Sequence, residues 1–423
     1  MKQEIYDTYV QILKEELVPA MGCTEPIALA YCASRCKDVL DDEIVSVDIY
    51  VSGNIIKNVK SVIVPNTDGL KGIEASVVAG IVAGKTSKIL EVIADVTKQQ
   101  KQDMRKFMKS IPMKVIPMES ESALDMCVHI FGKNHQAKVR IAGFHTNIIY
   151  ISRDDEVIYH SGVIASQDSS FTDRSLLNME DIYEFAMNVC IQDVQEILQR
   201  QIDCNLAIAR EGLKGNWGAN IGSVLLTAYG NDIKVKAKAY AAAGSDARMS
   251  GCEMPVIINS GSGNQGMTAS LPVIVYAMEE NITQEQLYRA LVISNLSTIH
   301  QKTGIGRLSA YCGAVSAGIG AGCGIAFLKG GDYKTIIHTL VNGLAIVSGI
   351  VCDGAKPSCA AKIASSVDAG ILGYYMYING CEFKGGDGIV CKGVENTIRN
   401  IGRLSREGMK ETDKEIIKIM ADL

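Results

Sequence analysis

The sequence is poor in aromatic residues and has no cluster of basic ones. Aromatic residues make up 6% of the chain, with a single tryptophan, whereas glycine occurs 40 times. This composition favours helices that pack closely, because small side chains let two backbones approach. The net charge of -5 and the lack of a clustered Lys/Arg face argue against nucleic acid and acidic membranes as partners.

The first residues, MKQEIYDTYVQILKEEL, contain neither an apolar signal-peptide core nor a small-residue cleavage site, so we expect a cytoplasmic protein. The longest uncharged run, Ala310–Leu328, is long enough to span a bilayer, but its apolar character comes mostly from alanine and glycine. Within this run, Gly318 and Gly322 would form a helix face of small residues that lets another backbone approach closely. We therefore predict a buried helix and no membrane partner.

Several common metal and nucleotide signatures are also missing. The chain has 13 cysteines, an odd number, and in a reducing compartment no disulfide framework is expected. CxxC-like pairs, an HExxH pattern, the lysine of a P-loop and a strand-led dinucleotide fingerprint are all absent from the sequence. Structural zinc, a histidine metal site and a bound nucleotide are therefore disfavoured.

The sequence patterns predict an α+β fold. At about 150 residues per domain, 423 residues admit two or three domains. We predict N-terminal helices over residues 1–40 that pack on the catalytic domain, then an α/β domain over 41–165, and a mainly helical catalytic domain over 166–423. Expected strands are Val45–Tyr50, Val62–Val64, Ala137–Ile141 and Asn147–Ile151. Expected helices are Leu70–Val82, Asp103–Met108, Gln284–Thr298, Leu308–Leu328, Tyr333–Ile350, Ser358–Ile378 and Val394–Leu423.

The segment VCDGAKPSCAAK contains two cysteines, Cys352 and Cys359, around a turn with Gly354 and Pro357. Such a turn can aim backbone N–H groups at sulfur, as loops around iron–sulfur clusters do. Together with Cys312 these residues are either buried thiols beside a turn or ligands of a cluster, and the spacing alone does not decide between the two.

Cys23 precedes Thr24-Glu25-Pro26, a typical helix start in which Thr24 would be the N-cap. A thiol there gains thiolate character from the helix dipole, whereas Glu25 opposes it. Cys23 is thus either a structural thiol or a reactive one. Cys32 and Cys36, one turn apart on the following helix, are expected to pack in the core.

Two polar loops are candidate ligand sites. The loop Asn259–Gly266, NSGSGNQG, precedes an apolar helix, and such a loop either binds an anion such as a substrate carboxylate or is an ordinary turn. In GFHTNI, the polar residues His145, Thr146 and Asn147 either bind a ligand or cap a hairpin.

Taken together and in order, several motifs resemble the iron–sulfur L-serine dehydratase alpha-chain family, closest to its L-cysteine desulfidase branch. They are PAMGCTEPIALA, SGNIIKN, GFHTNI, EGLKGNWGANIG, SDARMSG, NSGSGNQGMTASLP, GRLSAYCGA and SGIVCDGAKPSCAAK, and they cover essentially the whole chain. The sequence lacks the SxSHT-like motif and the longer ligand spacing of serine dehydratases, which puts serine in doubt as the preferred substrate.

The resemblance implies a [4Fe–4S] cluster held by Cys312, Cys352 and Cys359, without pyridoxal phosphate, and Cys23 as the proton acceptor. It also implies substrate contacts, for which we select Asn54, Asn58, His145, Thr146, Asn147, Ser262, Gly263, Asn264 and Gln265.

Three thiolate ligands leave one iron open, and an open iron can bind a leaving group. The expected activity is that of an L-cysteine desulfidase, which gives pyruvate, ammonia and hydrogen sulfide from a small amino acid. The alternatives are an L-serine dehydratase and a non-catalytic iron–sulfur protein. The glycine- and alanine-rich helices are compatible with a homodimer contact as well as with contacts inside one chain.

Overall fold

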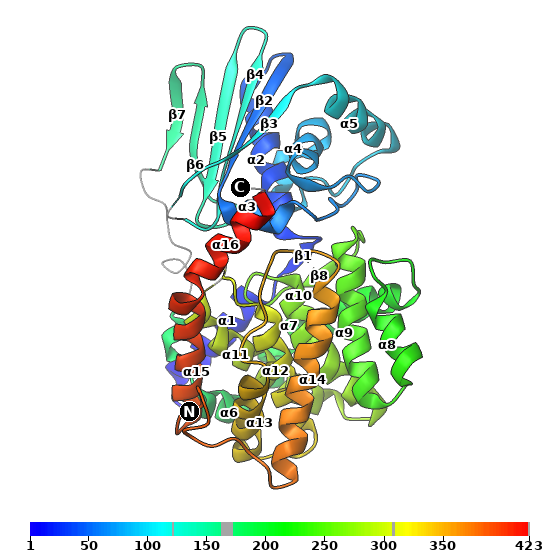
Figure 1. Ribbon diagram of the computed structural model, residues 1–423, viewed down its shortest axis with the longest axis vertical. Coiled ribbons are helices and arrows are strands. Elements are labelled where there is room, and N and C mark those ends of the chain that lie inside the picture. The colour runs from blue at the N-terminus through cyan, green and yellow to red at the C-terminus, as the bar shows by residue number, and fades with distance from the viewer. Residues whose placement is uncertain (121, 162–171, 307–308, 422–423) are drawn as a thin grey trace.

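The computed structural model describes residues 1–120, 122–161, 172–306 and 309–421. A part that contains a sheet stacks on a larger bundle of helices along the longest axis of the molecule (Figure 1). The strands of the sheet are β2 Ile44–Val51, β3 Met113–Pro117, β4 Asp125–Gly132, β5 Gln136–Ala142, β6 Ile148–Arg153 and β7 Glu156–His160. They lie in the order β3-β2-β4-β5-β6-β7, with β2 and β3 parallel and the other neighbours antiparallel. This mixed sheet beside a mainly helical part confirms the α+β class.

Helices precede, interrupt and follow the sheet. Those of the first half are α1 Gln3–Glu16, α2 Thr24–Leu40, α3 Gly53–Val59, α4 Gly72–Ala83 and α5 Lys98–Ser110. Those that follow are α6 Met179–Asn188, α7 Ile191–Leu213, α8 Ile221–Tyr229, α9 Ile233–Met249, α10 Gly263–Glu279, α11 Gln284–Ile305, α12 Gly313–Leu328, α13 Tyr333–Ile346, α14 Cys359–Ile378, α15 Val394–Arg403 and α16 Lys410–Ala421. Two short strands, β1 Pro19–Met21 and β8 Pro255–Ile257, pair antiparallel where the two parts meet.

Some expected elements differ from the structure. Val62–Val64 is not a strand, because Ile63 forms only an isolated bridge with Lys71. The long helix expected at the C-terminus is broken after Arg403 by a π-turn, Leu404–Gly408, before α16 begins. Leu308, the expected start of another helix, and the expected boundary at residue 165 lie outside the described residues, and α12 begins at Gly313.

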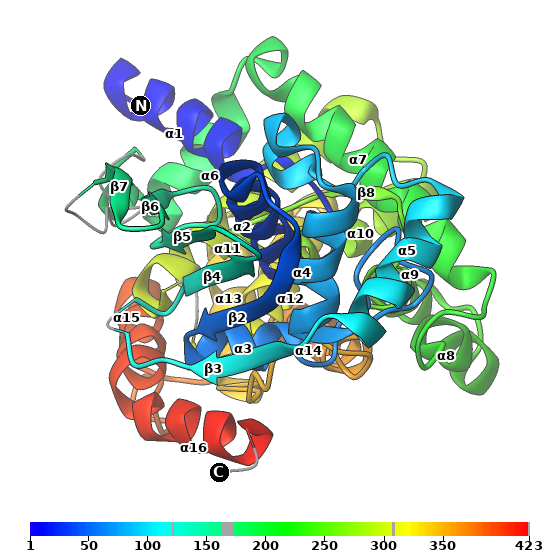
Figure 2. The same cartoon turned by 90° about the horizontal axis from the view of Figure 1, so that it is seen from above.

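The first forty residues divide between the two parts. We expected both N-terminal helices on the helical part, but only α1 joins that core. Helix α2 packs against the sheet, where its buried face includes Leu29, Cys32 and Cys36. The thiols of Cys32 and Cys36 donate to carbonyls of the strands, which fits the expected core role. Seen from above in Figure 2, α2 lies between the strands and α4, and its first turn reaches the cavity where the two parts meet.

Glycines allow α12 and α14 to touch backbone to backbone. A Cβ on Gly318 would lie 2.4 Å from the backbone carbon of Ser366, and one on Gly322 would lie 2.5 Å from the carbonyl oxygen of Gly370. The expected small face is thus used inside the chain, and most of α12 is buried. Within the described ranges, no helix is both long and apolar enough to cross a membrane.

We expect Gly370→Val to destabilise the protein strongly. A Cβ at position 370 would lie 2.2 Å from the carbonyl oxygen of Gly318, so the two helices would have to separate. Overpacking of this kind typically costs about 1–3 kcal/mol. The change is measured as a lower midpoint of urea unfolding. Ser365→Val, at an exposed position of the same helix, is the control and should shift the midpoint little; equal midpoints for the two variants would contradict the packing argument.

Candidate active site

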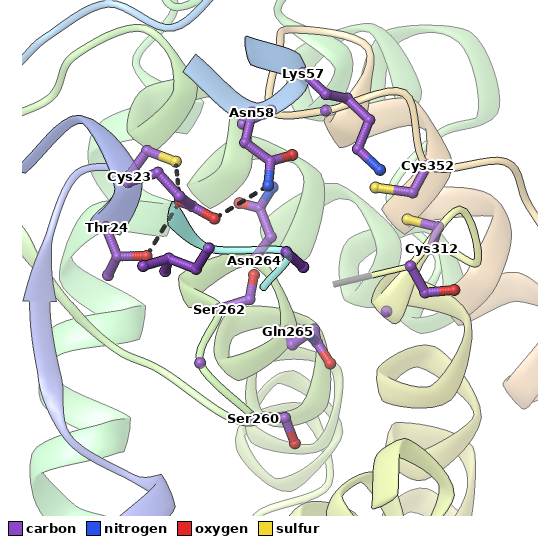
Figure 3. A pocket seen from close by; sticks show the side chains of 18 of the residues that line it. Cys23, Thr24, Lys57, Asn58, Ser260, Ser262, Asn264, Gln265, Cys312 and Cys352 are labelled. Carbon is purple, nitrogen blue, oxygen red and sulfur yellow. Dashed lines mark hydrogen bonds between the residues drawn. The ribbon is translucent and has the colours of Figure 1, made fainter. Parts of the chain in front are cut away.

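A cavity of about 330 Å³ lies where the sheet-containing part meets the helical bundle. Its walls come from the start of α2, from α3, from the loops after β5 and before α10, and from the segments before α12 and α14. Figure 3 shows Cys23 and Thr24 on one side and Cys312 and Cys352 on the other. Residues distant in sequence are thus gathered around one space.

The first turn of α2 contributes a thiol and a carboxylate. Cys23 is the N-cap residue of α2, although its side chain makes no capping hydrogen bond. Its Sγ donates to Glu25 Oε2 at 3.0 Å, and Asn58 Nδ2 donates to Glu25 Oε1 at 3.2 Å. The expectation that Thr24 caps the helix is wrong: Thr24 is the first helical residue and donates to Glu25 Oε2.

Cys23 carries its proton in this arrangement. Burial raises the pKa of the Cys23 thiol, and the nearby charge of Glu25 raises it further, while Arg248 acts in the opposite direction. The pKa of Glu25 is lowered, because His145, the Cys23 thiol and Arg248 together outweigh the effect of its burial. The pair is therefore a neutral thiol hydrogen-bonded to a carboxylate.

The loop before α10 holds a buried guanidinium. Ser262 is the N-cap residue of α10, and Asn264 Oδ1 accepts from Arg248 Nη1 at 3.1 Å. Arg248, near the end of α9, also donates from Nε to the carbonyl of Gly22 at 3.1 Å. Ser262, Asn264, Gln265 and Arg248 all line the cavity. The loop therefore fixes an arginine as well as offering its own polar groups.

We expect Gly263→Val to raise KM strongly. Gly263 does not itself line the cavity; a Cβ there would lie 2.4 Å from Arg248 Nε and 2.6 Å from Val256 Cγ2. A side chain at this position must push the guanidinium away. Steady-state kinetics of the anaerobically purified protein with L-cysteine, the expected substrate, would measure the change. An unchanged KM in Gly263→Val would contradict the argument.

Two backbone bridges bring the three candidate ligand cysteines to the cavity. The N–H of Cys312 donates to Ile350 O at 2.8 Å, and that of Cys352 donates to Ala310 O at 2.6 Å. These bonds place Cys312 beside Cys352, while Cys359 begins α14. Gly354 has φ +91°, and a Cβ there would lie 1.8 Å from Lys57 O, so only glycine fits where this loop meets α3.

The surroundings of these thiols favour the thiolate form at Cys352. The thiol of Cys312 donates to Cys352, which raises the pKa of Cys312 and lowers that of Cys352 to about 6. Lys57 and Lys302 lower the pKa of Cys352 further, whereas burial raises that of Cys359. Lys57 is 1% exposed and also pairs with Asp413 of α16, 2.5 Å away. Nearby cations thus favour the thiolate of Cys352, which is the form of cysteine that binds a metal.

The donor set fits an iron–sulfur cluster better than a single ion. No three His, Cys, Asp or Glu side chains in the described ranges are close enough to share one metal ion. In a cluster each thiolate binds a different iron, so its ligands surround a volume and need not converge on one point. Three thiols around one cavity meet that requirement, with Cys312, Cys352 and Cys359 as the residues that would hold the group.

Four residues selected from the sequence do not line the cavity. They are Asn54, in the first turn of α3, Thr146, Asn147 and Gly263. Asn147 donates from Nδ2 to Ala142 O at 2.8 Å and so closes its own turn. His145 does line the cavity, as does Asn58.

Sequence reasoning missed several charged and polar residues of the site. These are Glu25, Lys57, Arg248, Lys302, Ser260 and Tyr311. Glu25 was interpreted as a helix-start acid that opposes the ionisation of Cys23, and not as a residue of the site. Lys57 and Arg248 lie inside the quoted motifs SGNIIKN and SDARMSG, so the motifs could have found them; no local pattern shows that Lys302 is in the cavity.

Comparison with known proteins shows the family to which this two-part α+β chain belongs. The family of serine dehydratase alpha chains matches over residues 87–418, and the chain belongs to this family. The matched region contains Cys312, Cys352 and Cys359 but not Cys23 or Glu25.

The chain is also similar to proteins that carry only a family designation. A UPF0597 protein of Desulfitobacterium hafniense is 61% identical over 98% of this chain and 96% of its own length. Those of Lachnoclostridium phytofermentans and Bacteroides thetaiotaomicron are 48% and 35% identical, over 98% and 97% of this chain and 100% and 96% of theirs. These relatives extend the similarity over the N-terminal wall of the cavity.

Proposed function

We propose that the protein is an iron–sulfur-dependent lyase that eliminates sulfide from L-cysteine. The observation that carries the proposal is the placement of Cys312, Cys352 and Cys359 around a cavity that Cys23 also lines. When bound, the [4Fe–4S] cluster would supply a Lewis-acidic iron for the leaving group. Membership of the serine dehydratase alpha-chain family supports a lyase, and it favours L-serine as the second candidate substrate.

The reaction breaks the Cα–H and Cβ–S bonds and leaves aminoacrylate, which tautomerises and hydrolyses to pyruvate and ammonia. In this proposal Cys23 Sγ accepts the Cα proton. Cys23 must first release its own proton, and Glu25 Oε2, already hydrogen-bonded to it, relays that proton to solvent, so that the carboxylate is charged again when the substrate is bound. The first turn of α10 and its N-cap residue Ser262 help to hold the substrate at the end of a helix, where backbone N–H groups favour a carboxylate.

The test is a parallel assay of anaerobically purified, iron-containing protein with L-cysteine and L-serine. Pyruvate and sulfide in equal amounts from L-cysteine, with a kcat/KM at least about tenfold above that for L-serine, would support a desulfidase. Faster pyruvate formation from L-serine would assign the second candidate. Iron-containing protein that forms pyruvate from neither substrate would refute both.

A further inference from the structure

Two opposite charges are buried in the cavity without forming an ion pair. Arg248 is 3% exposed and Glu25 is 9% exposed. All the hydrogen-bond partners of both side chains are uncharged, and neither forms an ion pair with a residue in the described part of the chain. The charges of His145 and Arg248 act on Glu25 and lower its pKa. A buried charge is nevertheless costly, so proteins keep such groups chiefly where a ligand brings an opposite charge into direct contact with them.

Arg248 has a nitrogen available for an anion. Its Nε and Nη1 donate to Gly22 O and Asn264 Oδ1, which fix the plane of the guanidinium. Its Nη2 makes no hydrogen bond with any described residue, and the side chain lines the cavity. A planar guanidinium held in this way suits a carboxylate.

Glu25 offers the complementary charge. Its two oxygens accept three hydrogen bonds, from Cys23, Thr24 and Asn58. A carboxylate has about four acceptor positions, so it can take a further donor such as an ammonium group. An independent sign of a polar ligand is Gln265 Oε1, which is buried in the cavity wall and has no hydrogen-bond partner in the described ranges.

We propose that Arg248 and Glu25 together bind one free α-amino acid, Arg248 its carboxylate and Glu25 its ammonium group. This inference rests on the proposed function, because the ammonium at Glu25 places Cα next to Cys23 Sγ, which is 3.0 Å from the same carboxylate. The side chain then extends toward Cys312 and Cys352 on the other side of the cavity (Figure 3). Substrates in which either charge is blocked, such as peptides and N-acylated amino acids, are excluded.

The test measures binding, so that it does not depend on turnover. L-Alanine has both charges and no leaving group; L-alaninamide lacks the carboxylate and propionate lacks the ammonium. Calorimetric titration of the full-length, anaerobically purified protein should give L-alanine a Kd at least about tenfold lower than that of either analogue, the usual effect of one lost charged hydrogen bond. Equal affinity for alanine and an analogue would overturn the proposal without any variant.

Two variants assign each charge to its residue. Arg248→Gln should lose the preference for alanine over alaninamide, and Glu25→Gln should lose the preference for alanine over propionate. Arg140→Gln removes an arginine outside the cavity, and Glu16→Gln removes a buried carboxylate of α1; both controls should keep wild-type preferences. A preference that survives in Arg248→Gln or Glu25→Gln would overturn the assignment of that residue.

The experiments distinguish a failure of the amino-acid binding proposal from a failure of the proposed reaction. If alanine binds with both preferences but neither L-cysteine nor L-serine yields pyruvate, the proposed reaction is wrong and the binding roles of Arg248 and Glu25 stand. If pyruvate forms but Arg248→Gln and Glu25→Gln keep the wild-type KM and binding preferences, those binding roles are wrong and the reaction stands.

Discussion

Each of the three variants Cys312→Ser, Cys352→Ser and Cys359→Ser should reduce bound iron and lyase activity to background. A serine hydroxyl stays protonated at neutral pH and is a harder ligand than a thiolate. It therefore binds the iron of a cluster more weakly than a cysteine thiolate does. The three residues lie around one cavity, and Cys312 and Cys352 are held side by side by backbone hydrogen bonds. The measurements are iron and sulfide content after anaerobic purification, visible absorbance, and pyruvate formation.

Cys323→Ser is the matched control. Cys323 is fully buried in α12, and its thiol points to the carbonyl of Ile336, 3.7 Å away, which a hydroxyl can also use as an acceptor. This variant should keep wild-type iron and turnover. A variant of Cys312, Cys352 or Cys359 that keeps full iron and full turnover is not a ligand variant, and the cluster would then need a different set of thiols.

The sequence patterns predicted the fold where periodicity is strong. Val45–Tyr50 alternates because only one side chain in two faces the core, and it forms β2. β4, Asp125–Gly132, was missed because most of it is buried on both faces and shows no alternation. The length of the last helix was overestimated, because the helical pattern continues on both sides of the π-turn at Leu404–Gly408.

The site was predictable only where motifs carry it. Cys23, Asn58, His145 and the three cysteines come from quoted motifs and reach the cavity. The roles of Arg248 and Glu25 depend on what surrounds them, since the same residue types on a surface would be ordinary charges. Arg248 packs against Gly263, and Glu25 accepts hydrogen bonds from both Cys23 and Asn58. These are contacts made by the fold, and no local sequence spacing predicts them.

Replacement of Cys23 with serine should lower kcat by about two orders of magnitude or more, the usual size of a general-base contribution, while iron content and L-alanine binding stay at wild-type levels. The thiol is buried and hydrogen-bonded to Glu25, and burial together with that carboxylate already raises its pKa. A hydroxyl in the same place is harder still to ionise, so it keeps the hydrogen bond but cannot accept the Cα proton. Cys32→Ser is the matched control, because it makes the same thiol-to-hydroxyl change at a buried residue of α2 outside the cavity, where a hydroxyl can still donate to Val139 O, and it should leave kcat within a fewfold.

Iron content and exchange of the Cα proton with deuterium, measured on one preparation of Cys23→Ser, separate the possible roles of this thiol. Loss of exchange with full iron identifies Cys23 as the base. If both iron and exchange are lost, Cys23 is a fourth ligand, and the resting cluster has no open iron. Full iron with undiminished exchange would make Cys23 structural. The base would then have to be sought elsewhere, first at His145, which lines the same cavity and whose charge acts on Glu25.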